Sequence, residues 1–393
     1  MTVPVNGIHD LSFATTQYCL SIDRLAEHHG QPAEKFTKGL GQQTMSVPAP
    51  DEDIVTMAAT AAAPILERHG TGKLRAVLLA TETGVDESKA AALYLHDLIG
   101  LPATARVVEL KQACYAGTAA LQFASGLVTK QRGDHVLVIA TDIARYDLDT
   151  PAEPTQGAAA VAMLIATDPD IARLEPISGV HSADIMDFWR PAYRSTAVVD
   201  GKFSREAYLS AIEKAYADYA KQGGRALSEF RAYCYHQPFT KMSNKAHRHL
   251  LKSNEIPFTD EDIEAAVGHT IYYNQHVGNS YNASLYLALA SLLDHGGDLT
   301  DQPIALVSYG SGCVAEFFAV TAVPGYRDHL RTTSNQAAIA RRAHISYSRY
   351  RELHHIDPPR DGSDYLLPEE TSGPYRLVGY TGHQRIYETK QRF

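Results

Sequence analysis

The feature that most constrains the fold is a succession of segments that occurs twice in the same order. A turn of small residues is followed by a helix, a strand, a glycine-containing loop and a second strand, first from QACYAG and again from VGNSYNAS. The repeat favours an internal duplication within an α/β fold, although α/β proteins also repeat such units by default. The predicted helix and strands are 115–133, 135–142 and 158–168 in the first half, and 285–296, 304–310 and 313–323 in the second.

Other segments extend this pattern unevenly. A strand at 74–83, a helix at 88–100 and a strand at 105–112 precede the first repeat. Residues 204–222 have helical periodicity, with Tyr208, Ile212, Tyr216 and Tyr219 on one side. Residues 169–270 otherwise match neither half and are interpreted as an insertion that covers a site.

The expected organisation is therefore an N-terminal half, residues 1–168, and a C-terminal half, residues 169–393. The second half is expected to contain an inserted segment at about 180–230 and, after about residue 330, a peripheral helix with loops.

Composition excludes several function classes. The formal net charge of −9 argues against a nucleic-acid footprint, and no run of about 18 apolar residues predicts a membrane span. The four cysteines show no CxxC spacing, so neither a zinc ribbon nor a redox pair is indicated. The first residues lack a signal-peptide pattern, and we expect a cytoplasmic protein with reduced thiols.

Cys114 is the sharpest candidate for chemistry. It stands between a predicted strand and the start of a helix of small residues. The positive end of the helix dipole and free N–H groups would lower the pKa of the thiol and hold an oxyanion. Cysteine is also a common small buried residue, which is the interpretation we give to Cys19, Cys234 and Cys313.

His236 follows an aromatic strand-like stretch and precedes Gln237–Pro238. A histidine at a strand end can face a cleft, where a pKa near neutral suits proton transfer. Because the chain has 18 histidines, an arbitrary one is more often structural. Six others lie in charged surroundings, are assigned to the surface and form no metal set by their spacing: His28, His29, His247, His249, His354 and His355.

Glu82 ends the strand VLLATE, at the edge where α/β folds place ligands. Partial burial would raise its pKa and suit a general base. The alternative is an ordinary loop acid or a helix N-cap, and the local pattern alone favours the ordinary acid. Asp86 and Ser88 fit the capping of the next helix better.

Asn279 begins the second repeat as Cys114 begins the first, so the two could face one cleft and the amide could bind a substrate carbonyl. The loop SYGSGC (308–313) offers backbone N–H groups for an oxyanion hole, or forms only a tight turn.

Taken together, these segments resemble the bacterial branch of the 3-hydroxy-3-methylglutaryl-CoA synthase family. The resemblance covers most of residues 35–325, in the order of the family. The sequence departs from the family pattern at NGIHDLSF, where relatives carry a more acidic opening, and at Cys313. The segments are KFTKGLGQQTMSV, ATETGVDESKAAA, KQACYAGTAALQ, LVIATDIARY, AEPTQGAAAVAMLIA, DFWRP, HQPFTKM, VGNSYNASLYLALASLL and SYGSGCVAEFF.

The resemblance implies a duplicated thiolase-like fold with two pseudo-symmetric βαβαβ-type halves in five layers. It implies condensation of acetyl-CoA with acetoacetyl-CoA through an acetyl group on Cys114, without a metal or redox cofactor, and a homodimer paired through a sheet edge. The implied roles are nucleophile for Cys114, general base for Glu82, general acid for His236, acyl-carbonyl binding for Asn279, an oxyanion N–H for Ser311, acyl-pocket lining for Tyr146 and Thr155, and contact with coenzyme A phosphates for Lys241.

Three alternatives remain at this stage. A polyketide branch of the family acts on a β-keto group bound to an acyl carrier protein, but DFWRP, VDGKFSREAY and HQPFTKM favour the mevalonate branch. A ketoacyl synthase III-like enzyme would use Cys114, His236 and Asn279 and would need no base at Glu82. A non-catalytic scaffold would have no reason to keep these four residues together.

Overall fold

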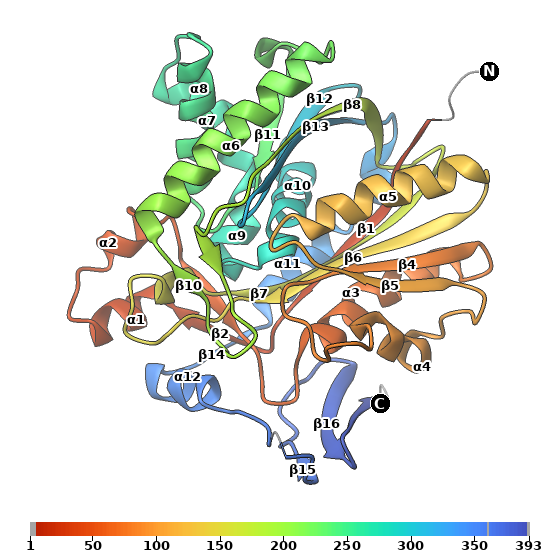
Figure 1. The fold of residues 1–393 in the computed structure, drawn as a ribbon, viewed down its shortest axis with the longest axis vertical. Helices are drawn as coiled ribbons and strands as arrows, with labels where there is room; N and C mark the ends of the chain where they lie inside the picture. The colour runs from red at the N-terminus through yellow and green to blue at the C-terminus, as the bar shows by residue number, and fades with distance from the viewer. Residues whose placement is uncertain (1–4, 360, 391–393) are drawn as a thin grey trace.

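The computed structural model describes residues 5–359 and 361–390. Nine strands form one mixed sheet in the order β11-β12-β13-β8-β1-β7-β6-β4-β5 (Figure 1). Its strands are β1 (Asn6–Thr15), β4 (Leu74–Ala80), β5 (Arg106–Leu110), β6 (His135–Ile143), β7 (Ala158–Thr167), β8 (Ala172–Ser182), β11 (Ala232–Tyr235), β12 (Pro303–Gly310) and β13 (Val314–Ala322).

The sheet consists of two half-sheets that meet at a weak junction. Only Gly7 and Ile8 of β1 pair with β8, through Arg173 and Ala172. On one side β1, β7 and β6 are antiparallel neighbours and β4 runs parallel to β6. On the other side β8, β13 and β12 are antiparallel neighbours and β11 runs parallel to β12. The same pairing pattern in both halves confirms the duplication.

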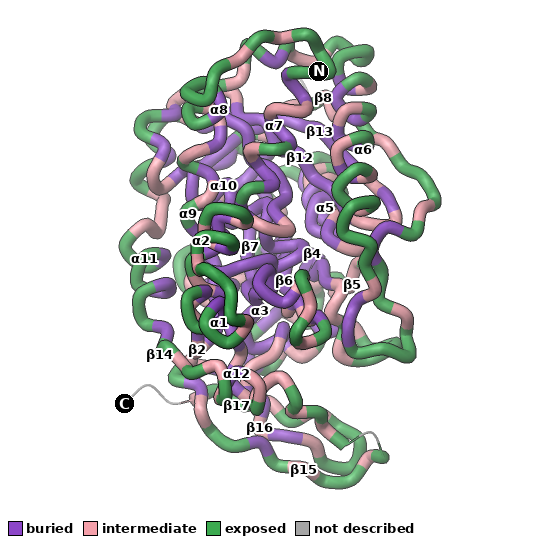
Figure 2. Tube along the Cα trace, turned by 90° about the vertical axis from the view of Figure 1, so that its left-hand side faces the viewer, coloured by how far each residue is buried: buried purple, intermediate pink, exposed green. Residues whose placement is uncertain are grey.

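Helices complete five layers. Helices α5 (Ala116–Lys130) and α10 (Ser284–His295) lie between the half-sheets and share one apolar core with both (Figure 1). Helix α3 (Ile54–His69) covers the outer face of the first half-sheet, and α6 (Gly201–Lys221) covers that of the second. Figure 2 shows the buried residues concentrated in the inner layers, with exposed ones on the outer helices and loops.

Alternation along the strands explains this layering. In β4, Ala76, Leu78 and Ala80 face the central helices, whereas Val77 and Leu79 face α3. Because successive side chains of a strand point to opposite faces, a strand that is apolar at every position needs a helix on both sides. The expected α/β fold with two related halves is confirmed.

The remaining elements lie around this core. Their bounds are α1 (Ile22–His28), α2 (Glu34–Thr37), α4 (Leu95–Ile99), α7 (Met242–Ser253), α8 (Asp260–Val267), α9 (Tyr272–Val277), α11 (Thr332–Ala340), α12 (Tyr347–His354), β2 (Tyr18–Ser21), β3 (Thr44–Val47), β9 (Phe188–Trp189), β10 (Val198–Val199), β14 (Ala343–His344), β15 (Tyr365–Leu366), β16 (Tyr375–Thr381) and β17 (Gln384–Thr389). No described helix is both long enough and apolar enough to cross a bilayer.

The interpretation of residues 169–270 as matching neither half was wrong. β8, α6 and β11 stand where β1, α3 and β4 stand in the first half. The sequence obscured this equivalence because β8 has only two buried residues, Ala172 and Gly179, and α6 is mostly polar, with only one apolar side. The hydrophobic patterns of β8 and α6 therefore differ from those of β1 and α3, which are more deeply buried.

Two further expectations need correction. The region after residue 330 contains two helices and a three-stranded sheet, β15-β16-β17, rather than one helix with loops. His247 is buried, not on the surface, and its Nδ1 lies 2.9 Å from the Tyr235 hydroxyl, because α7 turns that side toward β11. His29 and His354 are half-buried.

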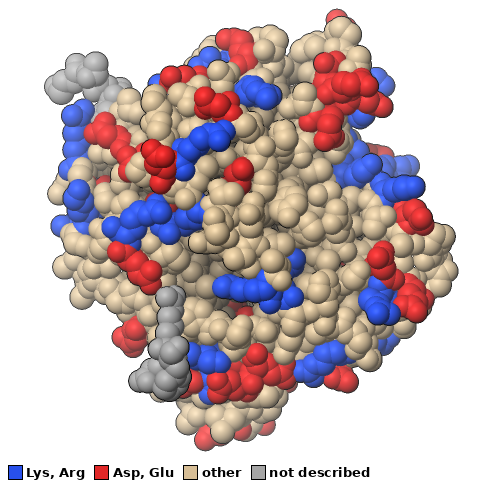
Figure 3. Space-filling view, turned by 180° about the vertical axis from the view of Figure 1, so that it is seen from behind, with Lys and Arg blue, Asp and Glu red and all other residues tan. Residues whose placement is uncertain are grey.

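Charged residues are mixed on the surface. On the face shown in Figure 3, acidic and basic side chains gather in small neighbouring groups rather than in one basic stripe.

Candidate active site

The candidate site lies where the two halves meet at the ends of the central helices. Cys114 precedes α5, and a short 3₁₀ turn, Tyr281–Ala283, precedes α10. The segment after β4 brings Glu82 to the same place. The chain reaches Cys114 through Ala113, whose φ of 43° is in the left-handed region, so the backbone turns sharply between β5 and α5.

Cys114 and Glu82 are in direct contact. The Cys114 thiol donates to Oε1 of Glu82 over 3.3 Å. Cys114 is 8% exposed, so bulk water does little to stabilise a charge on its sulfur. A thiol beside a carboxylate in a protected position is an arrangement in which the carboxylate can take the proton as the sulfur attacks.

The electrostatics of this pair differ from the sequence prediction. Burial and then the neighbouring Asp142 raise the pKa of Glu82 to about 8, against the opposing effects of Cys114 and Arg190. Burial and then the Glu82 carboxylate raise the pKa of Cys114 well above its usual value. The expected lowering of the thiol pKa was therefore wrong, because burial and nearby carboxylates oppose the helix end, whose Gly117 N–H already donates to Asn282 Oδ1 (2.8 Å).

Asp142, at the end of β6, connects the two halves beneath the pair. Its Oδ1 accepts from the hydroxyls of Thr81 and Thr83, both at 2.8 Å, and from the backbone N–H groups of Glu82 (2.8 Å) and Thr83 (3.1 Å). Its Oδ2 accepts from the backbone N–H (3.0 Å) and the side-chain amide (2.9 Å) of Asn282. This buried residue was not among the candidates that the sequence indicated, although the segment LVIATDIARY contains it.

Replacing Asp142 with asparagine should therefore disturb both the fold and the site. The new amide must point its NH₂ toward N–H or O–H donors, leaving buried groups unpaired. We expect a loss of about 2–4 kcal/mol in the free energy of unfolding, measured by denaturant unfolding. The exposed Asp184→Asn variant is the control and should change stability by less than ~0.5 kcal/mol. Equal stability of the two variants would contradict the connecting role.

His236 is held at the end of β11. Tyr208 donates to its carbonyl oxygen over 3.0 Å, and its own N–H donates to Val307 O over 3.0 Å. Burial lowers the pKa of the imidazole to about 3 instead of the near-neutral value expected. Among the described residues its Nδ1 has no hydrogen-bond partner. A neutral buried imidazole with an unused nitrogen is suited to bind a substrate carbonyl.

Asn279 and Tyr146 are brought together. The Asn279 amide donates to the Tyr146 hydroxyl over 3.3 Å, while its Oδ1 accepts from the N–H of Tyr281 (2.9 Å). Tyr146 and Tyr281 share a small apolar cluster with Cys114 and Phe188. This cluster can form a wall around a short acyl chain on the sulfur.

Thr155 lies beneath that wall. Its carbonyl accepts from the Asn279 N–H over 2.9 Å, and its hydroxyl donates to Ala152 O over 2.7 Å. Thr155 therefore supports Asn279 through its backbone, and its hydroxyl is engaged locally.

Ser311 lies on the loop that faces Cys114 from the second half. Its carbonyl accepts from the Gln112 amide over 3.2 Å. The preceding Gly310 has no room for a side chain, because a Cβ there would lie 2.6 Å from both Cβ and N of Tyr115. This close approach brings the Ser311 loop against the backbone around Cys114.

Asp187, in DFWRP, fixes the same loop and was also missed as a site residue. It is fully buried and accepts from Gly312 N–H (2.8 Å) and the Tyr309 hydroxyl (2.7 Å). Arg190 of the same segment donates to the Glu82 carbonyl. The DFWRP segment was expected only to cover a site. It instead holds two parts of the site, the Ser311 loop and the segment that carries Glu82.

A cleft of about 1670 Å³ opens beside the pair. Glu82 and Ser311 line it, together with Phe188 and Arg190 of the DFWRP segment. Lys241 is not among the described residues that line this cleft. It is exposed at the start of α7, where its N–H donates to Leu40 O over 2.8 Å.

Known proteins resemble this chain in sequence and in fold. A family model described as hydroxymethylglutaryl-coenzyme A synthase N terminal matches residues 4–170, and the corresponding C-terminal model matches residues 173–256 and 252–352. A hydroxymethylglutaryl-CoA synthase of Enterococcus faecalis is 41% identical over 350 residues, covering 88% of this chain and 91% of the relative. A polyketide-biosynthesis 3-hydroxy-3-methylglutaryl-ACP synthase of Bacillus subtilis is 32% identical, covering 87% and 86%.

Solved structures give the same result. An HMG-CoA synthase complexed with CoA superposes with a TM-score of 0.93 at 38% identity, covering 98% of this chain and all of the other. MvaS in complex with 3-hydroxy-3-methylglutaryl coenzyme A superposes with a TM-score of 0.90 at 35% identity, covering both chains fully.

Proposed function

Because the chain belongs to the hydroxymethylglutaryl-CoA synthase family, we propose that it condenses acetyl-CoA with acetoacetyl-CoA and water to give 3-hydroxy-3-methylglutaryl-CoA and CoA. The observation that carries the proposal is the part-buried hydrogen bond between the Cys114 thiol and the Glu82 carboxylate. The Enterococcus faecalis synthase is more similar than the polyketide enzyme, at 41% against 32% identity, so a CoA-bound acceptor is favoured over a carrier-bound one.

The first step loads the acetyl group. Cys114 sulfur attacks the thioester carbonyl of acetyl-CoA while Glu82 takes the thiol proton. Glu82 then gives this proton to the departing CoA thiolate and becomes a carboxylate again. A raised pKa of Glu82 suits this transfer, since the carboxyl group can hold the proton near neutral pH. The product is an acetyl thioester on Cys114, which divides one difficult condensation into covalent steps.

The second step forms the carbon–carbon bond. Glu82 removes a proton from the acetyl methyl, and the enolate oxygen binds to backbone N–H groups of Cys114 and Ser311. The enolate carbon attacks the ketone carbon of acetoacetyl-CoA, whose oxygen accepts a hydrogen bond from the neutral His236 ring. His236 gives this proton to the alkoxide and is reprotonated by the proton that Glu82 took from the methyl. Asn279 holds the acceptor carbonyl. Water finally cleaves the thioester and restores the Cys114 thiol.

This scheme transfers protons and an acetyl group and forms one carbon–carbon bond, with no net oxidation or reduction, and we propose that it runs without a metal or redox cofactor. The acyl pocket is formed by Tyr146 and Tyr281, with Thr155 positioning Asn279 from below. Lys241 is proposed to meet the CoA phosphates, since it is an exposed cation on the family motif PFTKM. A cytoplasmic location is part of the proposal, because all four cysteines are free thiols.

The acceptor is the part of the proposal that a single assay decides. Purified protein is mixed with acetoacetyl-CoA, acetyl-CoA is added, and loss of the acetoacetyl enolate absorbance is followed. Consumption that requires acetyl-CoA supports the proposal. Acetylation of the protein without consumption of acetoacetyl-CoA would overturn it, and consumption of a carrier-bound acetoacetyl group instead would identify the polyketide-type reaction.

The pH dependence should report Glu82. The carboxylate is the active form of a base, and burial raises its pKa to about 8. Since a raised pKa leaves the group protonated at lower pH, kcat/KM should rise with pH and level off above about pH 8. Below that point it should fall up to about tenfold per pH unit. A profile that is flat between about pH 6 and about pH 9 would contradict this assignment.

We also propose a homodimer through β5. This strand ends the first half-sheet, and its Val108 is 44% exposed, whereas every residue of the opposite edge strand, β11, is buried. An unpaired apolar edge can join its own copy across a two-fold axis. Light scattering after size exclusion should give a dimer for the native chain and a shift toward monomer for Val108→Glu. A monomeric native chain would exclude this interface.

A further inference from the structure

A cluster of histidines and carboxylates lies outside the proposed catalytic machinery. His28 and His29, at the end of α1, face Asp149 and Glu153 of the loop that follows Tyr146. His29 Nε2 lies 3.1 Å from Glu153 Oε2, and His28 Nε2 lies 3.3 Å from Asp149 Oδ1. About 120 residues separate the two segments along the chain, so sequence spacing gave no sign of the set.

The distances suit a metal ion. One ligand atom each from His29, Asp149 and Glu153 lies within 4.8 Å of the other two. Tetrahedral zinc with bonds of about 2.0–2.1 Å keeps its ligand atoms ~3.3–3.4 Å apart. The two histidine–carboxylate pairs, at 3.1 and 3.3 Å, are already close to that separation, and the distance between the pairs must shorten. The His28 and His29 rings, with centroids 5.3 Å apart, present nitrogen atoms from neighbouring positions.

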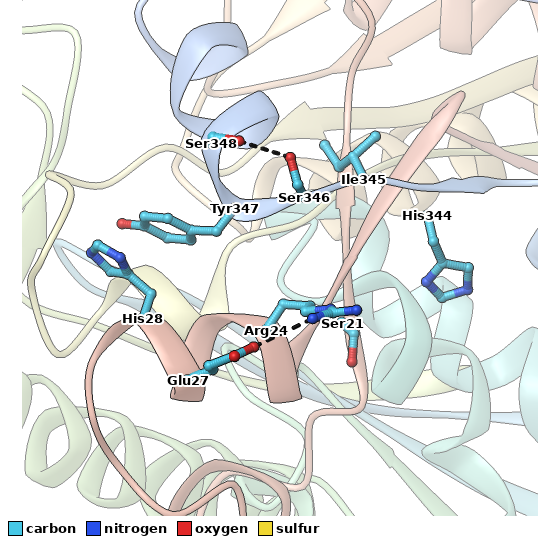
Figure 4. A pocket seen from close by; sticks show the side chains of 9 residues that line it. All are labelled: Ser21, Arg24, Glu27, His28, His344, Ile345, Ser346, Tyr347 and Ser348. Carbon is cyan, nitrogen blue, oxygen red and sulfur yellow. Dashed lines mark hydrogen bonds and ion pairs between the residues drawn. The ribbon is translucent and has the colours of Figure 1, made fainter.

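The cluster is partly buried and still open to solvent on one side, as a site for an ion requires. Glu153 has no exposed side-chain surface, and His29 is 19% exposed, so part of the set is protected from water. His28 lies under the Tyr347 ring at the edge of an open pocket of about 730 Å³ between α1 and α12 (Figure 4). An ion can therefore reach the set from solvent on the His28 side.

Neighbouring groups limit the charge that the set can hold. The Tyr347 hydroxyl lies 3.3 Å from Glu153 Oε1, and the Arg351 guanidinium lies 3.4 Å from Asp149 Oδ2. In these contacts Tyr347 and Arg351 bind carboxylate oxygens that do not face the histidines. The exception is a longer contact of 3.4 Å from the Tyr347 hydroxyl to Asp149 Oδ1. Because Arg351 already offsets part of the charge of the two carboxylates, the set can hold one divalent ion and not a second.

We propose that His28, His29, Asp149 and Glu153 form a binding site for one divalent ion of the zinc class. Each histidine binds through Nε2 as a neutral ring, with its proton on Nδ1, and each carboxylate supplies one oxygen. Two imidazole nitrogens favour zinc over magnesium, which prefers oxygen ligands. The ion joins α1 to the loop that carries Tyr146 and Thr155, and so restrains the wall of the acyl pocket from outside.

The test is zinc binding by the full chain after treatment with a chelator. Isothermal titration with Zn²⁺ should give one site per chain, and Zn²⁺ should raise Tm by about 2 °C or more, whereas Mg²⁺ should not. His28→Gln and His29→Gln keep a hydrogen-bond donor but remove the ligand nitrogen, and each should weaken binding at least ~10-fold. His249→Gln is the matched control, because His249 also pairs with a carboxylate, that of Glu213 at 2.9 Å, but lies outside the cluster.

A further variant excludes the reactive thiol as the zinc ligand. Binding that persists in Cys114→Ala supports the proposal, and binding lost in Cys114→Ala overturns it. Absence of saturable binding, or binding unchanged in both His28→Gln and His29→Gln, would also overturn it. Neither result bears on the condensation, because the assay reads ion binding and not turnover.

Discussion

Replacing Cys114 with alanine is expected to abolish both acetyl transfer and condensation, with a fall in turnover of at least ~10⁴-fold. The sulfur is the atom that carries the acetyl group, and no other described thiol lies beside Glu82. The measurement combines intact-protein mass spectrometry after exposure to acetyl-CoA with the acetoacetyl-CoA consumption assay. The variant should show neither the added acetyl mass nor consumption.

Cys19→Ala is the matched control for this variant. Cys19 is a buried free thiol on β2, outside the candidate site. It should keep acetylation and turnover near those of the native chain, apart from a small loss of stability. If Cys19→Ala lost the acetyl group and Cys114→Ala retained it, the assignment of the nucleophile would be wrong.

Replacing Glu82 with glutamine is expected to separate the two chemical steps. The amide can still accept the thiol hydrogen bond, but it cannot hold a proton taken from the acetyl methyl. The acetyl group should therefore still appear on Cys114, more slowly, while condensation falls by roughly 10²–10⁴-fold. Exchange of acetyl methyl protons with deuterated solvent, measured by mass spectrometry, should fall to the same extent.

The control for that experiment lies five residues further along the same segment. Glu87 is exposed on the same cleft, so Glu87→Gln changes the charge of the region without touching the thiol. Condensation should stay within about twofold of the native rate, as expected for a surface substitution away from the site. Equal losses in the two variants would show that local charge, and not the Glu82 base, controls the reaction.

These two results would also distinguish the alternative families. A decarboxylating ketoacyl synthase obtains its carbanion without a carboxylate base, so Glu82→Gln would have little effect on such an enzyme. A scaffold would show no acetylation in the native chain. The comparisons already assign the chain to the synthase family, and the variants test which residues carry its chemistry.

Local patterns predicted many of the elements that carry the site. Runs of apolar residues gave β4, β6, β7, β12 and β13 within a few residues of their observed bounds. The periodic tyrosines gave α6, where Tyr208, Ile212, Tyr216 and Tyr219 are indeed buried together. Such patterns succeed because strands and helices impose periods of 2 and 3.6 residues on the positions that a core must bury.

Local patterns failed where burial depended on distant segments. His247 lies in a charged stretch, yet α7 buries it against β11. The predicted pKa values of Cys114 and His236 were wrong for the same reason. The helix end and the strand end are local features, whereas the desolvation that dominates both values comes from segments far along the chain.

The sequence by itself therefore determined the α/β class, the repeat and, through motif order, the family and its candidate nucleophile and base. Only the tertiary structure decided that Asp142 joins Glu82 to Asn282, that Asp187 holds the Ser311 loop, and that His29 meets Glu153. The physical reason is the separation along the chain of the residues involved. Periodicity and motif spacing describe residues that are close in sequence. Buried carboxylates and their donors instead meet only after the two half-sheets have packed on α5 and α10.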